Sequence, residues 1–463
     1  MRYRYRISTF ILLAAGSWAV AQAQTEAPAA AGSLDVSFGG GTGLVTTVFN
    51  AASPINTDLA FDLVVQPDGK LVVAGWASDI SDPADFALAR YRPDGSLDPS
   101  FGGTGLVRAG FGPFSIEEGF ALLREPNGKL VVGGWAASSP LDPGVDFVLM
   151  RFLPSGQPDL SFGAGGKVKT NLGADDWVLV LARQPDGKLL AGGRSGPLGR
   201  HNFAVARFLP NGALDTTFGT AGKVTTDFAG RDDSIEALAL LPDGRILAAG
   251  PSGIGPTGGP FKMALARYNK QGKPDPTFGT GGKTLLSFGQ SSAATALALL
   301  AGGKFLVGGG IASGGATNMD FAVLRFNANG KLDPTFGTAG RVTTDFATKF
   351  DAVDDLRVLA NGKIVVAGQI DESQPGAADG AVGLARYTAN GQLDSTFGAA
   401  GRVRTRFPGS VGSSVEAMEM QTNDRIVVVG PVFPAFPAIG VSFGVARYLN
   451  GPAGQAAPAG GER

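Results

Sequence analysis

The chain has 463 residues and a net charge of −1, from 39 basic and 40 acidic residues. This balance leaves no basic surface for a phosphate backbone, so we expect no nucleic-acid partner. The absence of cysteine excludes disulfides and thiolate metal sites, and the single histidine, His201, excludes a histidine-rich metal site. The 71 glycines and 29 prolines recur at turn positions rather than in one block, which indicates many short strands.

The N-terminus has the pattern of a secretory signal peptide over residues 1–23. Arginines near the start precede an apolar run from Ile7 to Val20, and Ala21-Gln22-Ala23 fits a small-x-small cleavage site. The run is shorter than the ~20 residues that a membrane-spanning helix needs. We therefore expect a bacterial protein that is exported to the periplasm or beyond, without a membrane span after cleavage. Residues 24–33 read as an Ala/Pro-rich linker, and residues 450–463 as a disordered tail.

Beyond the linker, the chain repeats the short motif Asp-x-Ser/Thr-Phe-Gly. The motif begins seven times, at Asp35, Asp98, Asp159, Asp215, Asp275, Asp333 and Asp394. A nearly constant period of this length is typical of propellers, solenoids and arrays. We therefore treat residues 34–449 as one domain of seven repeats.

Each repeat contains four segments with strand-like patterns. In one copy, an alternating segment from Gly105 to Phe111 follows the motif, and an apolar segment from Ala121 to Leu123 comes next. The turn Pro126-Asn127-Gly128-Lys129 leads to a third segment from Leu130 to Gly134, and a fourth apolar segment ends the repeat. No stretch of useful length has helical periodicity. Four strands in each of seven repeats predict an all-β, seven-bladed β-propeller.

An arginine stands eight residues before the aspartate of each motif after the first. Because this arginine lies among apolar residues, it needs an acidic partner, and we predict a structural ion pair across the turn. The predicted pairs are Arg90–Asp98, Arg151–Asp159, Arg207–Asp215, Arg267–Asp275, Arg325–Asp333 and Arg386–Asp394.

One aspartate and one arginine of this pattern are left over. Asp35 has no arginine before it, and Arg447 has no aspartate after it. We predict that these two residues pair and that the N-terminal strand, Gly43 to Phe49, completes the last blade. The apolar second segment then lies innermost in each blade, and the segment after the motif lies outermost.

Two local features of the repeats also predict structure. The phenylalanine of each motif, such as Phe101, is expected to fill the space between neighbouring blades, and the glycine after it to permit the turn. In the last repeat, Asp424 replaces the glycine of the Pro-Asp-Gly-Lys turn, so we expect strain at that corner.

The motif, the Pro-Asp-Gly-Lys turn and the Ala-Leu-Ala-Arg-Tyr strand together resemble the delta-60 repeat family of bacterial exported proteins. The resemblance covers residues 34–448. It implies the propeller fold and export, and brings no settled activity. The order of the segments is also similar to NHL-type propeller repeats, which by analogy supports the assignment of the innermost strand.

The loops on one face of the predicted propeller vary in length and composition, so recognition is expected there. Carboxylates gather in the loops that enter the innermost strands: Asp58, Asp62, Glu117, Glu118, Asp175, Asp176, Asp233, Glu236, Asp354, Asp355 and Glu416. Such a ring could bind Ca²⁺, a hard cation that takes oxygen ligands. The interpretation that we favour is a set of solvated turn residues and strand-end hydrogen bonds. Trp76 and Trp135 occupy matching positions and either stack on a ligand or pack, and we favour packing.

Two functions remain open from the sequence. The first, which we favour, is an exported, monomeric, non-catalytic module that binds a protein or a glycan and needs no cofactor, because no distinctive catalytic constellation is present. The second is a Ca-dependent propeller hydrolase of the lactonase or esterase type, which requires carboxylates of several blades to converge on one ion. We interpret His201 as a loop residue rather than part of a Ser-His-Asp triad.

Overall fold

The fold is described from a computed structural model of the chain. The structure describes residues 29–53, 55–80, 82–138, 144–253, 260–313, 318–346, 350–371, 380–435 and 440–451. The predicted signal peptide, half of the linker and most of the predicted tail lie outside these ranges and stay predictions. Within them the helices are two short 3₁₀ turns, Gly39–Gly41 and Ala301–Gly303, and no described helix is long and apolar enough to cross a membrane.

Short antiparallel strands form sets of four that follow the order of the chain. The first set is β2 (Asn56–Val65), β3 (Leu71–Asp79), β4 (Asp85–Tyr91) and β5 (Leu106–Ala109), paired in that order. The next sets repeat this order with β6 (Ile116–Arg124), β7 (Leu130–Ala137), β8 (Asp146–Phe152), β9 (Lys167–Thr170); β10 (Asp175–Arg183), β11 (Leu189–Gly196), β12 (Asn202–Phe208), β13 (Lys223–Thr226); and β14 (Ala237–Leu240), β15 (Ile246–Ser252), β16 (Lys262–Tyr268), β17 (Lys283–Leu286).

Two further sets join into one sheet of eight strands. They are β18 (Ser292–Leu299), β19 (Phe305–Ala312), β20 (Met319–Phe326), β21 (Arg341–Thr344), and β22 (Phe350–Val358), β23 (Ile364–Asp371), β24 (Gly380–Tyr387), β25 (Arg402–Thr405). A single parallel bridge between Met319 and Phe350 joins them, so each retains its own four-stranded order.

The last set combines the two ends of the described chain. Its strands are β26 (Ser410–Ser413), β27 (Ala417–Met420), β28 (Arg425–Pro434), β29 (Ser442–Leu449) and, from the N-terminal segment, β1 (Leu44–Thr47). β1 pairs antiparallel with β29 and places Val45 opposite Val445. In addition, Asp35 N donates to Arg447 O at 2.8 Å. The N-terminal segment therefore lies against the C-terminal set.

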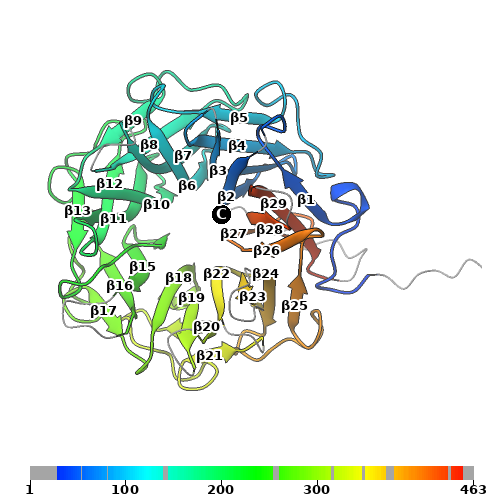
Figure 1. Cartoon of the computed structure of the whole chain (residues 1–463). Helices are drawn as coiled ribbons and strands as arrows, with labels where there is room; N and C mark the ends of the chain where they lie inside the picture. Colours follow the sequence, from blue (N-terminus) through cyan, green and yellow to red (C-terminus); the bar gives the residue numbers. More distant parts are fainter. Residues whose placement is uncertain are drawn as a thin grey trace, which may run out of the picture.

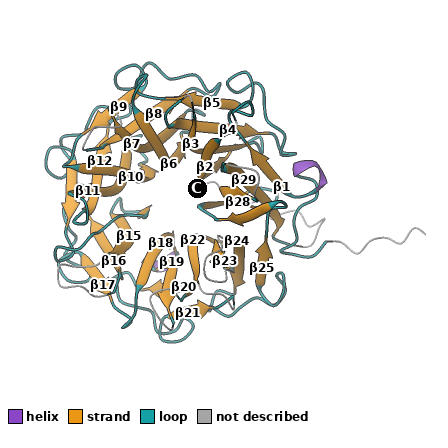
Figure 2. Ribbon diagram, in the orientation of Figure 1, coloured by secondary structure: helices purple, strands orange, loops and turns teal. Residues whose placement is uncertain are grey.

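The sets lie side by side around a common centre. Figure 1 shows β2, β6, β10, β18 and β22 at the inner edge and β5, β9, β13, β17 and β21 at the outer edge. Figure 2 shows the sets arranged around the centre, with the strands of each set side by side from the centre outward. The apolar second segment of each repeat is thus innermost, and the segment after the motif is outermost, as the sequence predicts.

The strand boundaries differ from the sequence prediction in a systematic way. The outermost strands have only four residues, as in β5, whereas the innermost strands begin earlier, at Asn56 in β2 and at Ile116 in β6. The predicted acidic loops are therefore partly strand. The register shifts between Ala60 and Asp62, so a bulge interrupts the two-residue alternation that identifies a strand in sequence.

The apolar core lies between neighbouring sets. One cluster joins Val72 and Leu88 of the first set to Leu130 and Val132 of the second, with Phe101 at its edge. The motif phenylalanines are fully buried: Phe38, Phe101, Phe162, Phe218, Phe278, Phe336 and Phe397 are each 0% exposed. Phe101 also packs against the turn of the next set, where a Cβ on Gly156 would lie 3.0 Å from its ring.

Each motif aspartate holds its arginine in a compact cluster, which we call the motif cluster. Arg90 Nε donates to Asp98 Oδ2 and Arg90 Nη2 donates to Ser100 Oγ, both at 2.9 Å. The guanidinium lies 4.6 Å from the centre of the Phe101 ring. Its Nη1 donates to Pro154 O of the next set at 2.6 Å. The motif cluster therefore stabilises the turn of its own set and attaches that set to the next one.

The same cluster recurs along the chain. The Nε to Oδ2 distances are 2.7 Å for Arg151–Asp159, 2.8 Å for Arg207–Asp215, 2.8 Å for Arg267–Asp275, 2.9 Å for Arg325–Asp333 and 2.7 Å for Arg386–Asp394. At the junction of the chain ends, Arg447 Nε lies 3.0 Å from Asp35 Oδ2, and Arg447 Nη1 donates to Pro93 O of the first set at 2.5 Å.

The turn of the last repeat has the strain that its sequence predicts. Asp424 has φ of 61°, a left-handed conformation that glycine adopts more readily than aspartate.

Candidate binding face and central channel

The predicted carboxylates lie at one end of the strand sets, which we call the loop face. It carries the connections between the second and third strands of each set, such as β3 and β4, and the connections that enter the innermost strands. The eleven carboxylates do not form one ring there. Nine of them separate into three groups with different partners.

The first group fastens neighbouring sets to one another. Asp58, Glu117, Asp176 and Asp233 each accept a hydrogen bond from a backbone N–H just beyond the outermost strand of the preceding set. The donors are Phe49 N at 2.9 Å, Phe111 N at 3.1 Å, Leu172 N at 2.5 Å and Phe228 N at 2.9 Å, in the same order. These four residues make strand-end hydrogen bonds, as the favoured interpretation predicts. They are not solvated turn residues, the other part of that interpretation, because all four are buried.

Burial makes three carboxylates of this group, Asp58, Glu117 and Asp233, reluctant to ionise. Asp58 and Glu117 are 0% exposed, and Asp58 Oδ1 has no hydrogen-bond partner in the described part of the chain. Burial raises the pKa of Asp58 to about 6 and the pKa of Glu117 to about 7. Burial likewise raises the pKa of Asp233 to about 6.

The second group joins consecutive innermost strands. Asp62 Oδ2 accepts a hydrogen bond from Leu122 N at 2.7 Å, and Asp355 Oδ2 accepts one from Met418 N at 2.9 Å. Asp355 also pairs with Arg357, whose Nη2 donates to Glu419 Oε1 at 2.9 Å. Asp62 and Asp355 therefore have structural partners.

A cavity of about 550 Å³ lies beside this second group. The innermost strands β14, β18, β22 and β27 line it, with Leu297, Leu356, Arg357 and Glu419 among its lining residues.

The third group lies at the bulges of the innermost strands. In five of the sets, one residue of the innermost strand has no partner in the register of the neighbouring strand. These residues are Phe61, Phe120, Leu179, Thr295 and Asp354. In the two other sets the corresponding residues are Glu236, whose N–H bonds to Ala249 O, and Glu416, whose N–H bonds to Val429 O. Because the innermost strands border the centre in Figure 1, we call these seven residues the channel ring.

One half of the channel ring is aromatic and aliphatic. The Phe61 and Phe120 rings lie 4.8 Å apart, and Phe120 stacks on Trp177 at 5.6 Å. Trp135 also lies 5.6 Å from Trp177, so it belongs to this aromatic wall, and Arg194 lies 4.1 Å above the Trp177 ring. Trp76, at the matching position of β3, is opposite Leu59 and Phe86.

The other half of the channel ring is acidic. Glu236, Asp354 and Glu416 are half-buried, and Thr295 stands between the first two in the order of the sets. Burial raises the pKa of Glu416 to about 7, and burial together with the charge of Glu416 raises the pKa of Asp354 well above its ordinary value. Burial also raises the pKa of Glu236, against the opposing effect of Arg194.

Two predicted carboxylates lie outside these groups. Asp175 begins β10 opposite Gly196, and Glu118 lies opposite Trp135 in the pairing of β6 with β7. Burial raises the pKa of Glu118 to about 7.

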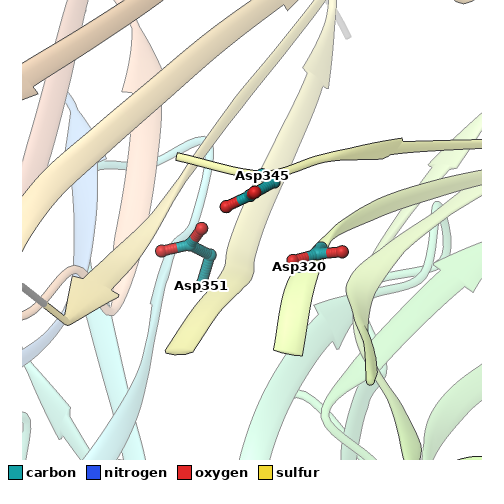
Figure 3. A group of neighbouring side chains, drawn as sticks. All are labelled: Asp320, Asp345 and Asp351. Atoms are coloured by element: carbon teal, nitrogen blue, oxygen red, sulfur yellow. The ribbon is translucent and has the colours of Figure 1, made fainter. Parts of the chain in front are cut away.

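A further carboxylate cluster, which the sequence analysis missed, lies between the sets of the eight-stranded sheet. Asp320, Asp345 and Asp351 place ligand oxygens within 4.8 Å of one another, and Figure 3 shows their carboxylates turned toward the same space. Asp351 also accepts a hydrogen bond from Phe346 N at 2.8 Å, like the first group. An alignment of the repeats on Asp58 and Glu117 would have identified Asp351, because it occupies the same position.

Large apolar side chains are exposed around the loop face. We call the set the apolar rim, and it consists of Ile55, Ile80, Phe114, Leu198, Phe261, Val411 and Phe433, with exposures of 42, 69, 76, 85, 43, 40 and 36%. All seven lie in loop-face connections or at the strand ends beside them. The other strongly exposed apolar residues, Val36, Leu160 and Leu285, lie in the motifs or on an outermost strand.

His201 lies in the connection between β11 and β12, as the interpretation as a loop residue predicts, but its side chain is buried there. Its side chain is only 1% exposed, and Nδ1 lies 2.6 Å from Asp232 Oδ1. His201 N also donates to Asp232 Oδ1 at 3.0 Å, and His201 O accepts from Asp233 N at 2.8 Å. The histidine therefore connects the start of β12 to the segment before β14.

Comparison with sequence families agrees with this architecture. A family described as a domain of unknown function (DUF5122) beta-propeller matches residues 66–101, 125–162, 184–218, 241–278, 301–336 and 359–397, a little under half of the chain. Each matched segment ends at the phenylalanine of a motif. The chain carries β-propeller repeats. The narrower resemblance to the delta-60 repeat family stays a prediction, and no curated protein matches the chain.

Solved structures resemble the chain at the level of the fold. Sqt1 from Chaetomium thermophilum aligns with a TM-score of 0.45 at 14% identity, over 82% of this chain and 97% of Sqt1. Polysaccharide lyase Uly1 aligns with a TM-score of 0.45 at 10% identity, over 87% of this chain and 91% of its own. A fungal alcohol oxidase of the AA5 family, in complex with copper, aligns with a TM-score of 0.48 at 13% identity, over 88% and 75%. At this level of similarity none of them informs the function of this propeller.

Proposed function

We propose that the chain is an exported, non-catalytic binding module, built as a seven-bladed propeller that the pairing of β1 with β29 closes. Its loop face holds the ligand. The pairing of the N-terminal segment with the last set supports the closed ring, because it covers a strand edge that would otherwise be open.

The apolar rim is the observation that carries the binding role. Phe114 and Leu198 expose 76 and 85% of their surface on the same face, together with five other large apolar side chains. A concentration of exposed apolar side chains on one face favours an interaction surface there. Among the two ligand classes that the sequence left open, exposed aliphatic and aromatic side chains favour a protein over a polar glycan.

A Ca-dependent hydrolase is the second candidate, and the cluster in Figure 3 favours it. In the part of the chain that the structure describes, Asp320, Asp345 and Asp351 are the one grouping with the spacing of metal ligands. They are distinct from the channel ring. Addition of EDTA and then Ca²⁺, followed by melting temperature and by lactonase and esterase turnover, tests this candidate. Turnover that requires Ca²⁺ would favour it over the binding module.

A pair of matched double variants tests the binding role. Phe114→Ser with Leu198→Ser removes the two most exposed residues of the rim, and Val36→Ser with Leu160→Ser removes equally exposed apolar residues elsewhere. Each variant is used as bait for cell-envelope proteins, and in parallel on an array of envelope polysaccharides. We expect the first pair to lose a protein ligand that the wild type and the second pair retain. Equal capture by both pairs, or binding of polysaccharides alone, would contradict the proposal.

A further inference from the structure

We infer that Asn390 is a site of covalent modification, at which the folded protein deamidates spontaneously to aspartate and isoaspartate. Asn390 lies in the exposed turn Thr388-Ala389-Asn390-Gly391, between β24 and β25. This turn is at the end of the strand sets opposite the loop face, so the inference is independent of the proposed binding function. Glycine after asparagine favours the reaction, because it has no side chain to hinder an attack by its backbone nitrogen.

The reaction closes a five-membered ring on the asparagine side chain. The nitrogen of Gly391 attacks Cγ of Asn390, a C–N bond forms, and the bond from Cγ to Nδ2 breaks. Ammonia leaves with the proton of the Gly391 amide. Water, the one co-reactant, then opens the succinimide at either of its carbonyl carbons. Opening at Cγ gives aspartate, and opening at the former main-chain carbon gives isoaspartate, whose main chain runs through Cβ and Cγ.

The chain contains six Asn-Gly sequences, and five of them lie in exposed turns, beginning at Asn127, Asn211, Asn329, Asn361 and Asn390. The sixth, Asn450, is 5% exposed, and its side chain is hydrogen-bonded to Arg386 and Asp424. In all five exposed turns the glycine N–H donates to the carbonyl oxygen three residues earlier, at 2.8 or 2.9 Å. This turn hydrogen bond therefore does not distinguish the five sites.

The side chain of Asn390 differs from those of the other four. In those turns asparagine Oδ1 accepts a hydrogen bond from the backbone N–H two residues on, a common arrangement for asparagine in turns. The donors are Lys129 N at 3.0 Å, Ala213 N at 3.1 Å, Lys331 N at 3.1 Å and Lys363 N at 3.0 Å. Ring closure requires the side chain to leave its rotamer, so this bond adds to the barrier. In the described part of the chain, the side chain of Asn390 makes no such bond.

The first residue of the turn explains this difference. The N–H of Gln392, two residues after Asn390, donates to Thr388 Oγ1 at 3.2 Å instead. Leu209 and Leu359 occupy the position of Thr388 in two of the other turns and have no side-chain acceptor. A side-chain acceptor at the start of a turn thus competes with asparagine for the same N–H.

The two products have different effects on the attachment of the β18–β21 set to the β22–β25 set. Arg325 Nη1 donates to Ala389 O at 3.0 Å, and Gly337 N donates to Asn390 O at 3.1 Å. Aspartate preserves this backbone, and Asp94 already occupies the matching position in another set. Isoaspartate lengthens the main chain by one carbon and converts the Asn390 carbonyl into a free carboxylate. It therefore weakens the attachment.

The experiment incubates the purified full chain at pH 8 and 37 °C and quantifies deamidation by peptide mapping, with digestion at acidic pH where ring closure is slow. We expect deamidation at Asn390 to be at least about fivefold faster than at any of the other four exposed sites. Thr388→Val preserves the branched shape but removes Oγ1, so Gln392 N becomes free to bond to Asn390. This variant should slow Asn390 at least about threefold and leave Asn211 and Asn361, the internal references, unchanged.

A second measurement tests the effect on the fold. Methylation by protein isoaspartyl methyltransferase counts the isoaspartate, and ion exchange separates the aged fraction. That fraction should melt several degrees below the fresh protein, whereas Asn390→Asp should melt at the wild-type temperature. Equal rates at the five turns, no deamidation at Asn390, or an unchanged rate in Thr388→Val would overturn the inference. Equal melting of aged and fresh protein would show that isoaspartate leaves the attachment of the sets intact.

Discussion

The motif clusters and the loop face both contain buried carboxylates, but the pKa values of these carboxylates shift in opposite directions. At Asp98 burial alone would raise the pKa, but hydrogen bonds from Ser100, with Lys70 and Arg90 nearby, hold it well below its ordinary range. At Glu117 burial dominates, and the pKa rises to about 7. The difference lies in the partners: each motif aspartate has an arginine, whereas the loop-face carboxylates bind mainly backbone N–H groups.

This difference separates the parts that build the fold from the parts that give it a function. The motif clusters repeat because every set must attach to the next one in the same way. Corresponding positions outside the motif clusters vary, as with Phe120 in one set and Glu416 in another. Ionised carboxylates with paired cations are typical of structural positions, and carboxylates with raised pKa values are more frequent at functional sites.

The largest effect is expected from the loss of the N-terminal segment. Deletion of residues 34–49 removes β1 and leaves Arg447 without the carboxylate that lies 3.0 Å away. An unpaired buried charge costs about 3–5 kcal/mol, and the exposed edge of β29 adds to this cost. We expect a fall in melting temperature of more than about 10 °C by circular dichroism.

Val36→Ser in the same segment is the control, because its side chain is 67% exposed. Unchanged thermal unfolding of the deletion would show that the ring does not depend on this pairing.

A smaller effect is expected within a single motif cluster. Lys188 Nζ lies 3.1 Å from Asp215 and 3.5 Å from Asp186, but only Asp215 is buried and paired with Arg207. Asp215→Ala should therefore cost about 3 kcal/mol, whereas Asp186→Ala should cost less than about 0.5 kcal/mol. Urea unfolding of both variants measures the difference. Equal losses would mean that the shared lysine, and not the buried pair, carries the stability.

The motif clusters, which recur in every repeat, are well predicted from the sequence. The eight-residue spacing identifies the Arg90–Asp98 pair, and the unmatched Asp35 and Arg447 indicate that the ends of the domain meet. These inferences succeed because one physical requirement, the pairing of a buried arginine, recurs in every copy. The strain at Asp424 is predictable as well, because the other copies of this turn carry glycine at the corresponding position.

The loop face is much less predictable. Asp58 and Glu236 appear alike in sequence, yet one bonds to Phe49 N and the other lies at a bulge in the channel. A bulge shifts the facing of side chains by one residue, and no local pattern marks it. The apolar rim was also missed, because its members, such as Phe114 and Leu198, come from separate copies and form a surface only when the sets surround a centre.

The pH dependence of stability distinguishes the motif aspartates, whose pKa values are lowered, from the buried loop-face carboxylates, such as Glu117, whose pKa values are raised. A group with a raised pKa keeps its proton in the folded state at a pH where the unfolded chain has lost it, so stability falls as pH rises through the folded pKa. For Glu117 this window extends from its model-compound value near 4.5 to about 7. We expect a melting temperature several degrees higher at pH 5 than at pH 8. The motif aspartates, whose pKa values are lowered, lose their contribution only in strong acid.

Glu117→Gln sharpens this prediction, since the amide can still accept from Phe111 N, 3.1 Å from Oε1 in the wild type. The variant should be more stable at pH 8, by about 1–2 kcal/mol, and should show a smaller difference between pH 5 and pH 8. Asp68→Asn, at an exposed turn, is the control. A melting temperature that rises steadily from pH 5 to pH 8 would contradict the assignment.

The smallest effect concerns the backbone next to the motif clusters. Gly281 and Ala339 occupy the same turn position in neighbouring repeats, with φ of 59° and 52°. A Cβ on Gly281 would meet no atom within 4 Å, so its cost would come from the left-handed backbone alone. We expect Gly281→Ala to destabilise the protein and Ala339→Gly to stabilise it, each by about 0.5–1 kcal/mol. Calorimetry of the single and double variants should give opposite shifts that nearly cancel. Shifts of the same sign would mean that packing, and not the shared backbone geometry, decides which residue each repeat carries at this turn.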